Sequence, residues 1–118
     1  MDIKLFDSEL KLMELVWEAE PQSAKQLGLT ANERFGWNKN TTYTVLKKLV
    51  EKNAVSRSEP GFMCASLVGR EDIRRAETET LIKKLYGGSK KALFSSLLKD
   101  EALSADELDE LKRLIEKR

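Results

Sequence analysis

A stretch of short polar and basic residues, Trp37 to Asn53, has the residue types best suited to binding chemistry. With about 100° per residue, its apolar and polar side chains gather on opposite sides of a helix. The apolar side consists of Thr42, Val45, Leu46, Leu49 and Val50. The polar side consists of Asn40, Thr41, Thr44, Lys47, Lys48 and Glu51. Short polar groups in the first turns, with lysines behind them, suit a helix that meets base edges and phosphates.

Two groups of residues in and around this helix are candidates for DNA contacts. We expect contacts with base edges of the major groove from Asn40, Thr41, Tyr43, Thr44 and Lys47. An Asn amide can pair bidentately with adenine, and a Thr side chain can meet the methyl group of thymine. We expect phosphate contacts from Lys39, Lys48, Lys52 and Arg57. Each phosphate contact adds about 0.9 to the salt slope on duplex DNA, so binding should weaken steeply with salt.

The same residues allow plainer interpretations. Polar outer faces are the norm for surface helices, and Asn or Thr near a helix start often only caps it. Tyr43 lies at the border of the two faces, where packing at the edge of the core with a wet hydroxyl would also explain it. Any of the lysines can be a solvated surface charge, and for Lys52 that is the better interpretation. A helical protein–protein adaptor, whose basic helix meets an acidic partner, is the alternative class of function.

The composition describes a small, highly charged protein. Of its 118 residues 35% are charged, against about 25% in an average globular domain. The net charge is only +1, but residues 36–58 carry five basic residues against one acidic residue. Residues 99–118 carry seven acidic residues against five basic ones. A basic middle and a mildly acidic end suit a protein that binds a polyanion with one part and something else with the other.

Residue counts restrict the classes of chemistry further. The chain has no His, the commonest general acid/base and metal ligand, and no Gly-rich phosphate loop. Its one cysteine, Cys64, excludes an intrachain disulfide, which fits a reducing compartment, and we expect a buried structural thiol. No apolar run approaches the ~20 residues of a membrane span, and the start lacks a signal-peptide core. We expect a cytoplasmic protein that is not an enzyme, with no cofactor and no metal.

Capping residues and helix breakers predict three helices followed by a hairpin. The expected helices and their caps are residues 7–20 with Asp7, residues 24–35 with Ser23, and residues 41–52 with Asn40. Asn53 then occupies a position that needs a left-handed backbone. Two short alternating runs, residues 54–59 and 62–67, flank Pro60-Gly61 and predict a β-hairpin. This element order is that of a winged-helix domain, a helix-turn-helix variant, over residues 1–69.

Beyond Gly69 the sequence predicts three further helices with little core of their own. The expected helices are residues 71–86, residues 90–98 with Ser89 as cap, and a last helix with Ser104 as cap and Glu107 completing a capping box. Without a partner, much of their apolar surface would face water. We expect residues 70–118 to form a helical dimerisation domain, and a packed monomeric cap is the alternative. The expected interface residues are Leu81, Leu85, Leu93, Phe94, Leu97, Leu98, Leu108, Leu111 and Ile115.

With these elements in place, the chain resembles the BlaI/MecI family of bacterial repressors, the penicillinase and methicillin-resistance regulators. The resemblance covers nearly the whole length and depends on six pieces in the right order and spacing. The pieces are Leu12-Met-Glu-Leu-Val-Trp17, Trp37-Asn-Lys-Asn-Thr-Thr-Tyr-Thr-Val-Leu-Lys-Lys-Leu49, Val50-Glu-Lys-Asn-Ala-Val55, Ser66-Leu-Val68, Leu85-Tyr-Gly-Gly88 and Leu103-Ser-Ala-Asp-Glu-Leu-Asp-Glu-Leu111. Each piece alone is weak, whereas the six together make a strong match.

The resemblance implies a winged-helix DNA-binding domain and a helical dimerisation domain that together bind operator DNA as a homodimer. It implies palindromic operators, inverted repeats built on TACA/TGTA half-sites, at which the dimer represses transcription. It also implies release from DNA when a membrane sensor-protease pathway triggers cleavage of the repressor within its dimerisation domain. By alignment, the bond at that position is Ser96–Leu97.

The sequence departs from the family pattern at several positions. The best-known members have Asn-Phe where this chain has Ser96–Leu97, which concerns the proteolytic switch and not DNA binding. The copper-responsive branch ends in paired Cys-x-Cys motifs, which this sequence lacks, so copper sensing is not expected. Asn53 replaces a usual Gly, and the wing tip from Ser58 to Phe62 offers only Arg57 nearby as a phosphate ligand.

Overall fold

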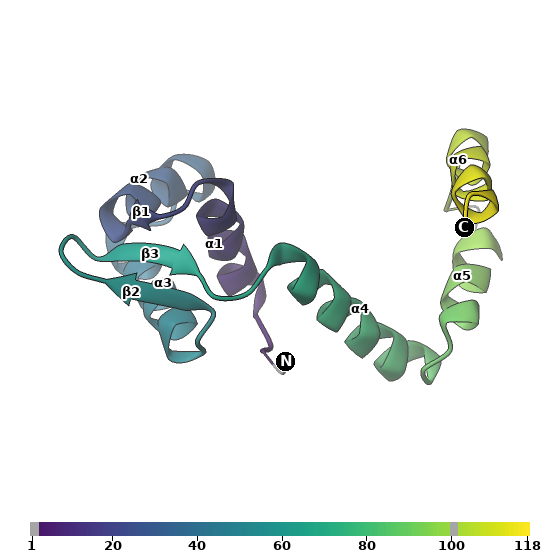
Figure 1. Ribbon diagram of the computed structural model, residues 1–118, viewed down its shortest axis with the longest axis horizontal. Coiled ribbons are helices and arrows are strands. Elements are labelled where there is room, and N and C mark those ends of the chain that lie inside the picture. Colours follow the sequence, from purple (N-terminus) through teal and green to yellow (C-terminus); the bar gives the residue numbers. More distant parts are fainter. Residues whose placement is uncertain (1–2, 100–101) are drawn as a thin grey trace. The chain divides into compact units, whose positions relative to one another are not determined.

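The structure, a computed structural model, describes residues 3–99 and 102–118. Its helices are α1 (Asp7–Glu18), α2 (Ala24–Phe35), α3 (Lys39–Glu51), α4 (Arg70–Tyr86), α5 (Lys90–Lys99) and α6 (Ala105–Glu116). Its strands are β1 (Gln22–Ser23), β2 (Val55–Ser58) and β3 (Met63–Ser66). The mainly helical class with a small hairpin, predicted from the sequence, is confirmed (Figure 1).

Two of the predicted helix caps are wrong. Asp7 already lies in α1, and the preceding Phe6 donates its backbone N–H to the Glu9 carboxylate at 2.8 Å. The side chain of Asn38, not Asn40, caps α3 by accepting from the Thr41 N–H at 2.8 Å. The helix therefore begins at Lys39, two residues before the predicted start. At α3 two asparagines flank Lys39, and the local pattern does not decide which one caps; at α1 the residue before the helix is Phe6, which makes no side-chain cap.

The predicted roles of Ser23 and Asn53 at helix ends are confirmed, and Gly36 marks a further end. The Ser23 side chain caps α2 by accepting from the Gln26 N–H at 3.1 Å. Gly36 ends α2 with a φ of 72°, a left-handed conformation that a residue with a Cβ seldom adopts. Asn53 follows α3 with a φ of 62°, as expected for the residue that commonly replaces Gly at this position.

The sheet has one strand more than the sequence predicted. β2 and β3 form the expected antiparallel hairpin, with Arg57 opposite Cys64. β1 pairs with the other edge of β3 and places Gln22 opposite Cys64, so the strand order is β1-β3-β2. A strand of two residues is too short to show any alternation in sequence, and only the approach of β3 makes it a strand.

One core joins α1, α2, α3 and the hairpin. Its largest fully buried apolar side chains are Leu12, Met13, Val16, Leu27, Leu46, Leu49 and Val55. The three helices lie on one face of the sheet (Figure 1). Full burial of a side chain of this size is worth about 1.5–3 kcal/mol, so these residues hold α3 in place against the rest of the unit. The indole N–H of Trp17 donates to the Val68 carbonyl at 2.9 Å and ties the end of the hairpin to α1.

The chain divides into two compact units between Glu77 and Thr78, inside α4. The predicted boundary, between residues 69 and 70, lies two turns earlier. The first turns of α4 belong to the N-terminal unit because Ile73 is buried in its core. Arg70 also pairs with Glu14 of α1 at 2.9 Å. Because α4 runs continuously from one unit into the other, no Gly or Pro marks the boundary between them in the sequence.

The C-terminal unit contains the rest of α4, α5 and α6. The Ser89 side chain accepts from the Ala92 N–H at 3.0 Å at the start of α5. The predicted capping box of α6 is confirmed: the Glu107 N–H donates to Ser104 at 3.1 Å, and the Ser104 N–H donates to the Glu107 carboxylate at 2.9 Å. Ser104 and Glu107 thus satisfy backbone donors at the helix start that would otherwise have no partner.

Candidate nucleic-acid interface

The outer face of α3 is polar and exposed, while its inner face is buried. Thr42, Val45, Leu46 and Leu49 are buried, which confirms the face assigned to the core. The exposed residues are Lys39, Asn40, Thr41, Thr44, Lys47, Lys48 and, at the end of the helix, Glu51. Because Asn38 caps the helix, a capping role does not account for Asn40 and Thr41. The N-terminal half of α3 therefore presents short hydrogen-bonding side chains to solvent, with basic residues at both ends of this group.

Tyr43 is half-buried at the edge of this face. Its ring lies 6.2 Å from the Phe62 ring, centroid to centroid, in an edge-to-face arrangement. The Lys39 ammonium lies 5.8 Å from the centroid of the Tyr43 ring. Packing at the edge of the core is thus present at Tyr43, and it joins the start of α3 to the hairpin. Because Tyr43 is only half-buried, part of its side chain remains exposed to solvent.

The Lys52 ammonium is committed to groups inside the protein. It pairs with the Glu9 carboxylate at 2.6 Å and donates to the Lys4 carbonyl at 2.8 Å. It also lies 4.5 Å from the centroid of the Phe6 ring. Glu9 is only 1% exposed, so its charge needs this partner. These contacts argue against a phosphate role for Lys52 and for a role in joining the N-terminal segment to the end of α3.

Arg57 lies at the wing, the hairpin of β2 and β3, and is also paired. Its guanidinium contacts the Glu59 carboxylate at 2.8 Å and covers the Phe62 ring at 3.8 Å from the centroid. The side chains of Arg57 and Glu59 are about half exposed, at 51% and 58%. The pair has no net charge, so the wing attracts phosphate less strongly than the lone arginine in the sequence suggested.

Lys25 is a basic residue that the sequence reasoning did not single out. It lies at the start of α2 and is exposed. Together with Gly28, Leu29 and Asn32 of α2, it lines an open surface pocket that Lys39 and Tyr43 of α3 complete. Its place next to the cap of α2 was visible in the sequence, but its proximity to α3 depends on how the two helices cross.

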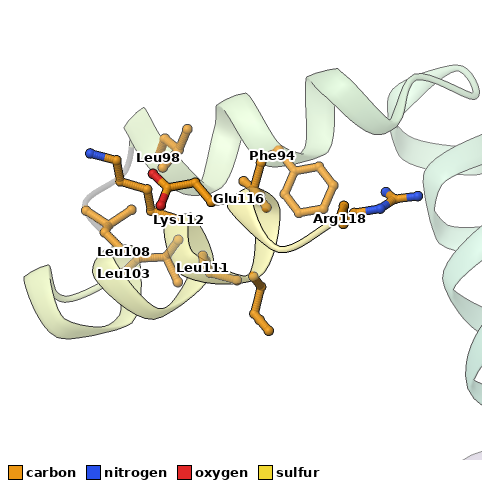
Figure 2. A pocket seen from close by; sticks show the side chains of 10 residues that line it. Phe94, Leu98, Leu103, Leu108, Leu111, Lys112, Glu116 and Arg118 are labelled. Carbon is orange, nitrogen blue, oxygen red and sulfur yellow. The ribbon is translucent and has the colours of Figure 1, made fainter.

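An apolar groove runs between α5 and α6 in the C-terminal unit. Figure 2 shows leucines of α6 pointing toward Phe94 and Leu98 of α5. The groove has a volume of about 610 Å³, and its lining is largely apolar. The predicted interface residues that line it are Phe94, Leu98, Leu108, Leu111 and Ile115, with Leu103 and Leu114 in addition.

The other predicted interface residues lie on α4 and α5. Leu81 and Leu85 of α4 are 43% and 66% exposed, and Leu97 of α5 is 37% exposed. Leu93 is half-buried. The bond between Ser96 and Leu97 lies inside α5, one turn before its end, and Ser96 is half-buried. A segment in helical conformation does not fit the extended binding site of a typical protease, so cleavage here would require α5 to open first.

Three further features concern metal binding, membrane-spanning helices and the cysteine. Within residues 3–99 and 102–118 there is no cluster of three or more acidic, Cys or His side chains able to hold a metal ion. No helix in those ranges is long and apolar enough to cross a membrane. Burial raises the pKa of the Cys64 thiol, which lies in β3 and is not exposed. The thiol therefore fits the expected structural role.

Comparison with known proteins identifies the family. The family described as penicillinase repressor matches residues 5–117. The chain belongs to this family. Its members are transcriptional repressors and not enzymes, which agrees with the resemblance seen in the sequence and with the expected absence of catalysis.

Two curated relatives illustrate the relationship. The methicillin resistance regulatory protein MecI of Staphylococcus aureus (strain N315) is 27% identical over 123 residues, covering 100% of both chains. The penicillinase repressor of Bacillus licheniformis is 21% identical over 115 residues, covering 96% of this chain and 90% of the relative. The similarity thus extends over both units and is not confined to the winged helix.

Two solved structures share the fold. The DNA-binding domain of the repressor BlaI in solution has a TM-score of 0.55 at 21% identity and covers 58% of this chain and 87% of that domain. The Bacillus licheniformis BlaI monomeric form, in complex with the blaP half-operator, has a TM-score of 0.55 at 20% identity and covers 61% of this chain and 90% of the other. The predicted winged-helix fold is confirmed for this member of the penicillinase repressor family.

Proposed function

We propose that this chain is a homodimeric transcriptional repressor that binds an inverted-repeat operator through the outer face of α3. The observation that carries the proposal is the exposed row of Asn40, Thr41, Thr44 and Lys47 on a helix whose inner face packs into the core. A rigid helix with exposed short polar side chains can enter a major groove and read its base edges. The BlaI structure determined with a blaP half-operator gives a precedent for DNA binding in this family.

In this proposal the first turns of α3 read bases. Asn40, Thr41 and Thr44 are exposed. Asn40 would pair with adenine, and Thr41 and Thr44 would meet thymine methyl groups, which suits half-sites of the TACA/TGTA type. Tyr43 contributes from the border of the face, and Lys47 reaches a base edge or the adjoining backbone. Each good base contact is worth about 1–3 kcal/mol of discrimination against the wrong base.

Phosphate contacts come from basic residues that surround this row. Lys39 and Lys48 lie on the exposed face of α3. Lys25 of α2 lines the same surface pocket as Lys39. Arg57 extends the set to the wing, although its charge is compensated by Glu59. Lys52 is left out of this set because its ammonium holds the buried Glu9 carboxylate. Contacts to phosphate position the protein on the duplex and make binding depend on salt.

Two copies of α3 meet two half-sites if the C-terminal units associate. The apolar groove of α5 and α6, together with Leu81 and Leu85 of α4, supplies exposed apolar surface for such a contact. A dimer that holds one half-site meets the second at a high effective concentration, an advantage that a monomer lacks. Occupying a promoter in this way excludes polymerase without any chemistry by the protein.

Release from DNA would follow from damage to the C-terminal unit. We propose that a signal, through a membrane sensor-protease pathway, leads to cleavage at Ser96–Leu97 in the middle of the dimerisation surface. Cutting there separates α6 from most of α5 and leaves Phe94 on one fragment and the other residues that line the apolar groove on the other. The dimer, and with it the operator affinity, would be lost.

The proposal is tested by mobility shift with an inverted repeat of TACA/TGTA half-sites and a scrambled duplex of equal length, over a salt series. The double variant Thr44→Ala/Lys47→Ala should lose about 2–4 kcal/mol of operator affinity, since one base contact and one basic contact disappear. Its preference for the operator over the scrambled duplex should fall toward one. The mass of the dimer, measured by sedimentation, should stay the same.

The control variant is Thr78→Ala/Lys83→Ala, which removes the same residue types from exposed positions of α4. It should bind the operator as the unaltered protein does. Operator affinity that survives the α3 changes would show that the recognition face lies elsewhere. No selective shift by the unaltered protein at any salt concentration, with capture of an acidic protein by the basic helix, would favour the adaptor.

A further inference from the structure

Three residues of the wing form a closed set of contacts, named here the wing clasp: Arg57, Glu59 and Phe62. The Arg57 Nε–H donates to Glu59 Oε1 at 2.9 Å, and Arg57 Nη2 lies 2.8 Å from the same oxygen. The other oxygen, Glu59 Oε2, accepts from the Phe62 N–H at 3.1 Å. The Arg57 guanidinium carbon lies 3.8 Å from the centroid of the Phe62 ring. Contacts on two sides thus fix the orientation of this guanidinium.

The wing clasp is electrically neutral under ordinary conditions. The hydrogen bond from the Phe62 N–H, followed by the hydrogen bond from Arg57, lowers the pKa of the Glu59 carboxyl below its usual value. Glu59 is therefore ionised near neutral pH and cancels the charge of Arg57. A phosphate approaching the wing meets a carboxylate next to the arginine that would bind it.

The wing clasp also lies beside the helix proposed to read the DNA. Phe62 packs edge-to-face against Tyr43 of α3, with 6.2 Å between the ring centroids. Lys39 lies over the other aromatic ring of this pair, 5.8 Å from the centroid of Tyr43. A helix in the major groove would consequently bring the clasp near the flanking phosphates.

We propose that Glu59 acts as an internal competitor for DNA phosphate, holding Arg57 in a neutral ion pair and so limiting the wing's contribution to affinity. This inference builds on the proposed DNA-binding function. A guanidinium has five N–H donors, and Glu59 occupies two of them. The remaining donors can reach a phosphate, but the paired charge releases fewer counterions than a free one would. Removing the charge of the Glu59 carboxylate should therefore strengthen DNA binding. This is the opposite of what is expected when a basic residue that contacts phosphate is removed.

The test compares Glu59→Gln, Arg57→Gln and the double variant with the unaltered full-length chain. Glutamine keeps an oxygen that can accept from the Phe62 N–H, so the turn is preserved while the charge is lost. Fluorescence anisotropy titrations with the inverted repeat and with a scrambled duplex are run over about 0.05–0.3 M salt. Glu79→Gln, an exposed carboxylate of α4, is the control for net charge.

Glu59→Gln should bind both duplexes about fivefold to tenfold more tightly at about 0.1 M salt, with a salt slope steeper by about 0.9, because one more phosphate is neutralised. This gain should vanish in the Arg57→Gln background and be absent in Glu79→Gln. Equal or weaker binding by Glu59→Gln, with the melting temperature retained, would overturn the inference. A gain that persists without Arg57 would overturn it as well.

The outcomes also separate this inference from the proposed function. Equal affinity of the unaltered protein for the inverted repeat and the scrambled duplex refutes operator recognition, and the effect of Glu59→Gln is still scored on either duplex. If the unaltered protein binds no duplex at all, both proposals are wrong.

Discussion

The two units of the chain differ in how far they bury their apolar side chains. In the N-terminal unit, Leu12, Met13 and Leu46 are completely buried. In the C-terminal unit, none of the described residues of α5 and α6 is buried, and Ile115 is 71% exposed. The first unit therefore completes its core with its own chain, whereas the second presents an apolar groove that is exposed to solvent in the single chain.

This difference has a functional meaning for a repressor. The helix that we propose reads the DNA must keep one orientation, and α3 does so because α1, α2 and β2 pack against it. An association surface must stay available in the single chain, and its contribution to stability then depends on protein concentration. The proposed division of labour follows from where each unit buries its leucines.

The largest contrast is expected from truncating a core leucine. Leu46→Ala in α3 should destabilise the N-terminal unit by about 2–5 kcal/mol, since it removes packing and leaves a cavity. Leu29→Ala, at a site 58% exposed, should change the free energy of unfolding by less than about 0.5 kcal/mol. Urea unfolding followed by tryptophan fluorescence measures both, because Trp17 and Trp37 lie in this unit. Equal losses for the two variants would remove the distinction between core and surface leucines.

A charge introduced into the groove between α5 and α6 should weaken association through the C-terminal unit and leave the stability of the N-terminal unit unchanged. Leu111→Asp in α6 should raise the dimer dissociation constant by about a hundredfold, since an unpaired carboxylate would be buried on association. Unfolding monitored by tryptophan should not change. Sedimentation equilibrium at micromolar concentration measures the mass, with Glu110→Ala on the exposed side of α6 as the control. A mass of one chain for the unaltered protein would contradict the proposed dimer.

The smallest of the three effects is expected at an ion pair within the N-terminal unit. Glu9→Gln leaves Lys52 without its carboxylate, and because Lys52 is 30% exposed, the loss should be about 1–3 kcal/mol, less than for a fully buried pair. The Glu18–Arg34 pair on the surface is the matched control, and Glu18→Gln should leave the urea midpoint where it was. Equal losses in the free energy of unfolding for Glu9→Gln and Glu18→Gln would show that the Glu9–Lys52 pair stabilises the unit no more than a surface ion pair does.

Much of the fold was predictable because its signals are local. The inner and outer faces of α3 follow from a period of 3.6 residues, and every residue assigned to its apolar face is buried or half-buried. Ser23, Gly36 and Ser104 mark helix ends through the chemistry of their own backbone or side chain. The cap assigned to Asn40 was wrong because Asn38, two residues earlier, makes the same hydrogen bond, and the cap assigned to Asp7 was wrong because α1 begins after Phe6 with no side-chain cap.

The candidate site was less predictable than the fold. The exposed row on α3 could be read from the sequence, but the state of its charges could not. Lys52 and Glu9 are 43 residues apart in the chain, and Lys25 and Lys39 line the same pocket only because α2 packs against α3. Arg57 and Glu59 are only two residues apart, so this ion pair was open to a local reading of the sequence that took Arg57 alone as a phosphate ligand.

The sequence by itself determined the helices, the hairpin, the polar face of α3 and the family, since these depend on periodicity, capping and residue order along the chain. Only the tertiary structure decided that the Glu9 carboxylate neutralises Lys52, and that Gln22 and Ser23 add a third strand to the hairpin. The physical reason is that charge compensation and strand pairing depend on groups brought together by packing. A repeating pattern along one segment does not record which distant group will lie beside it.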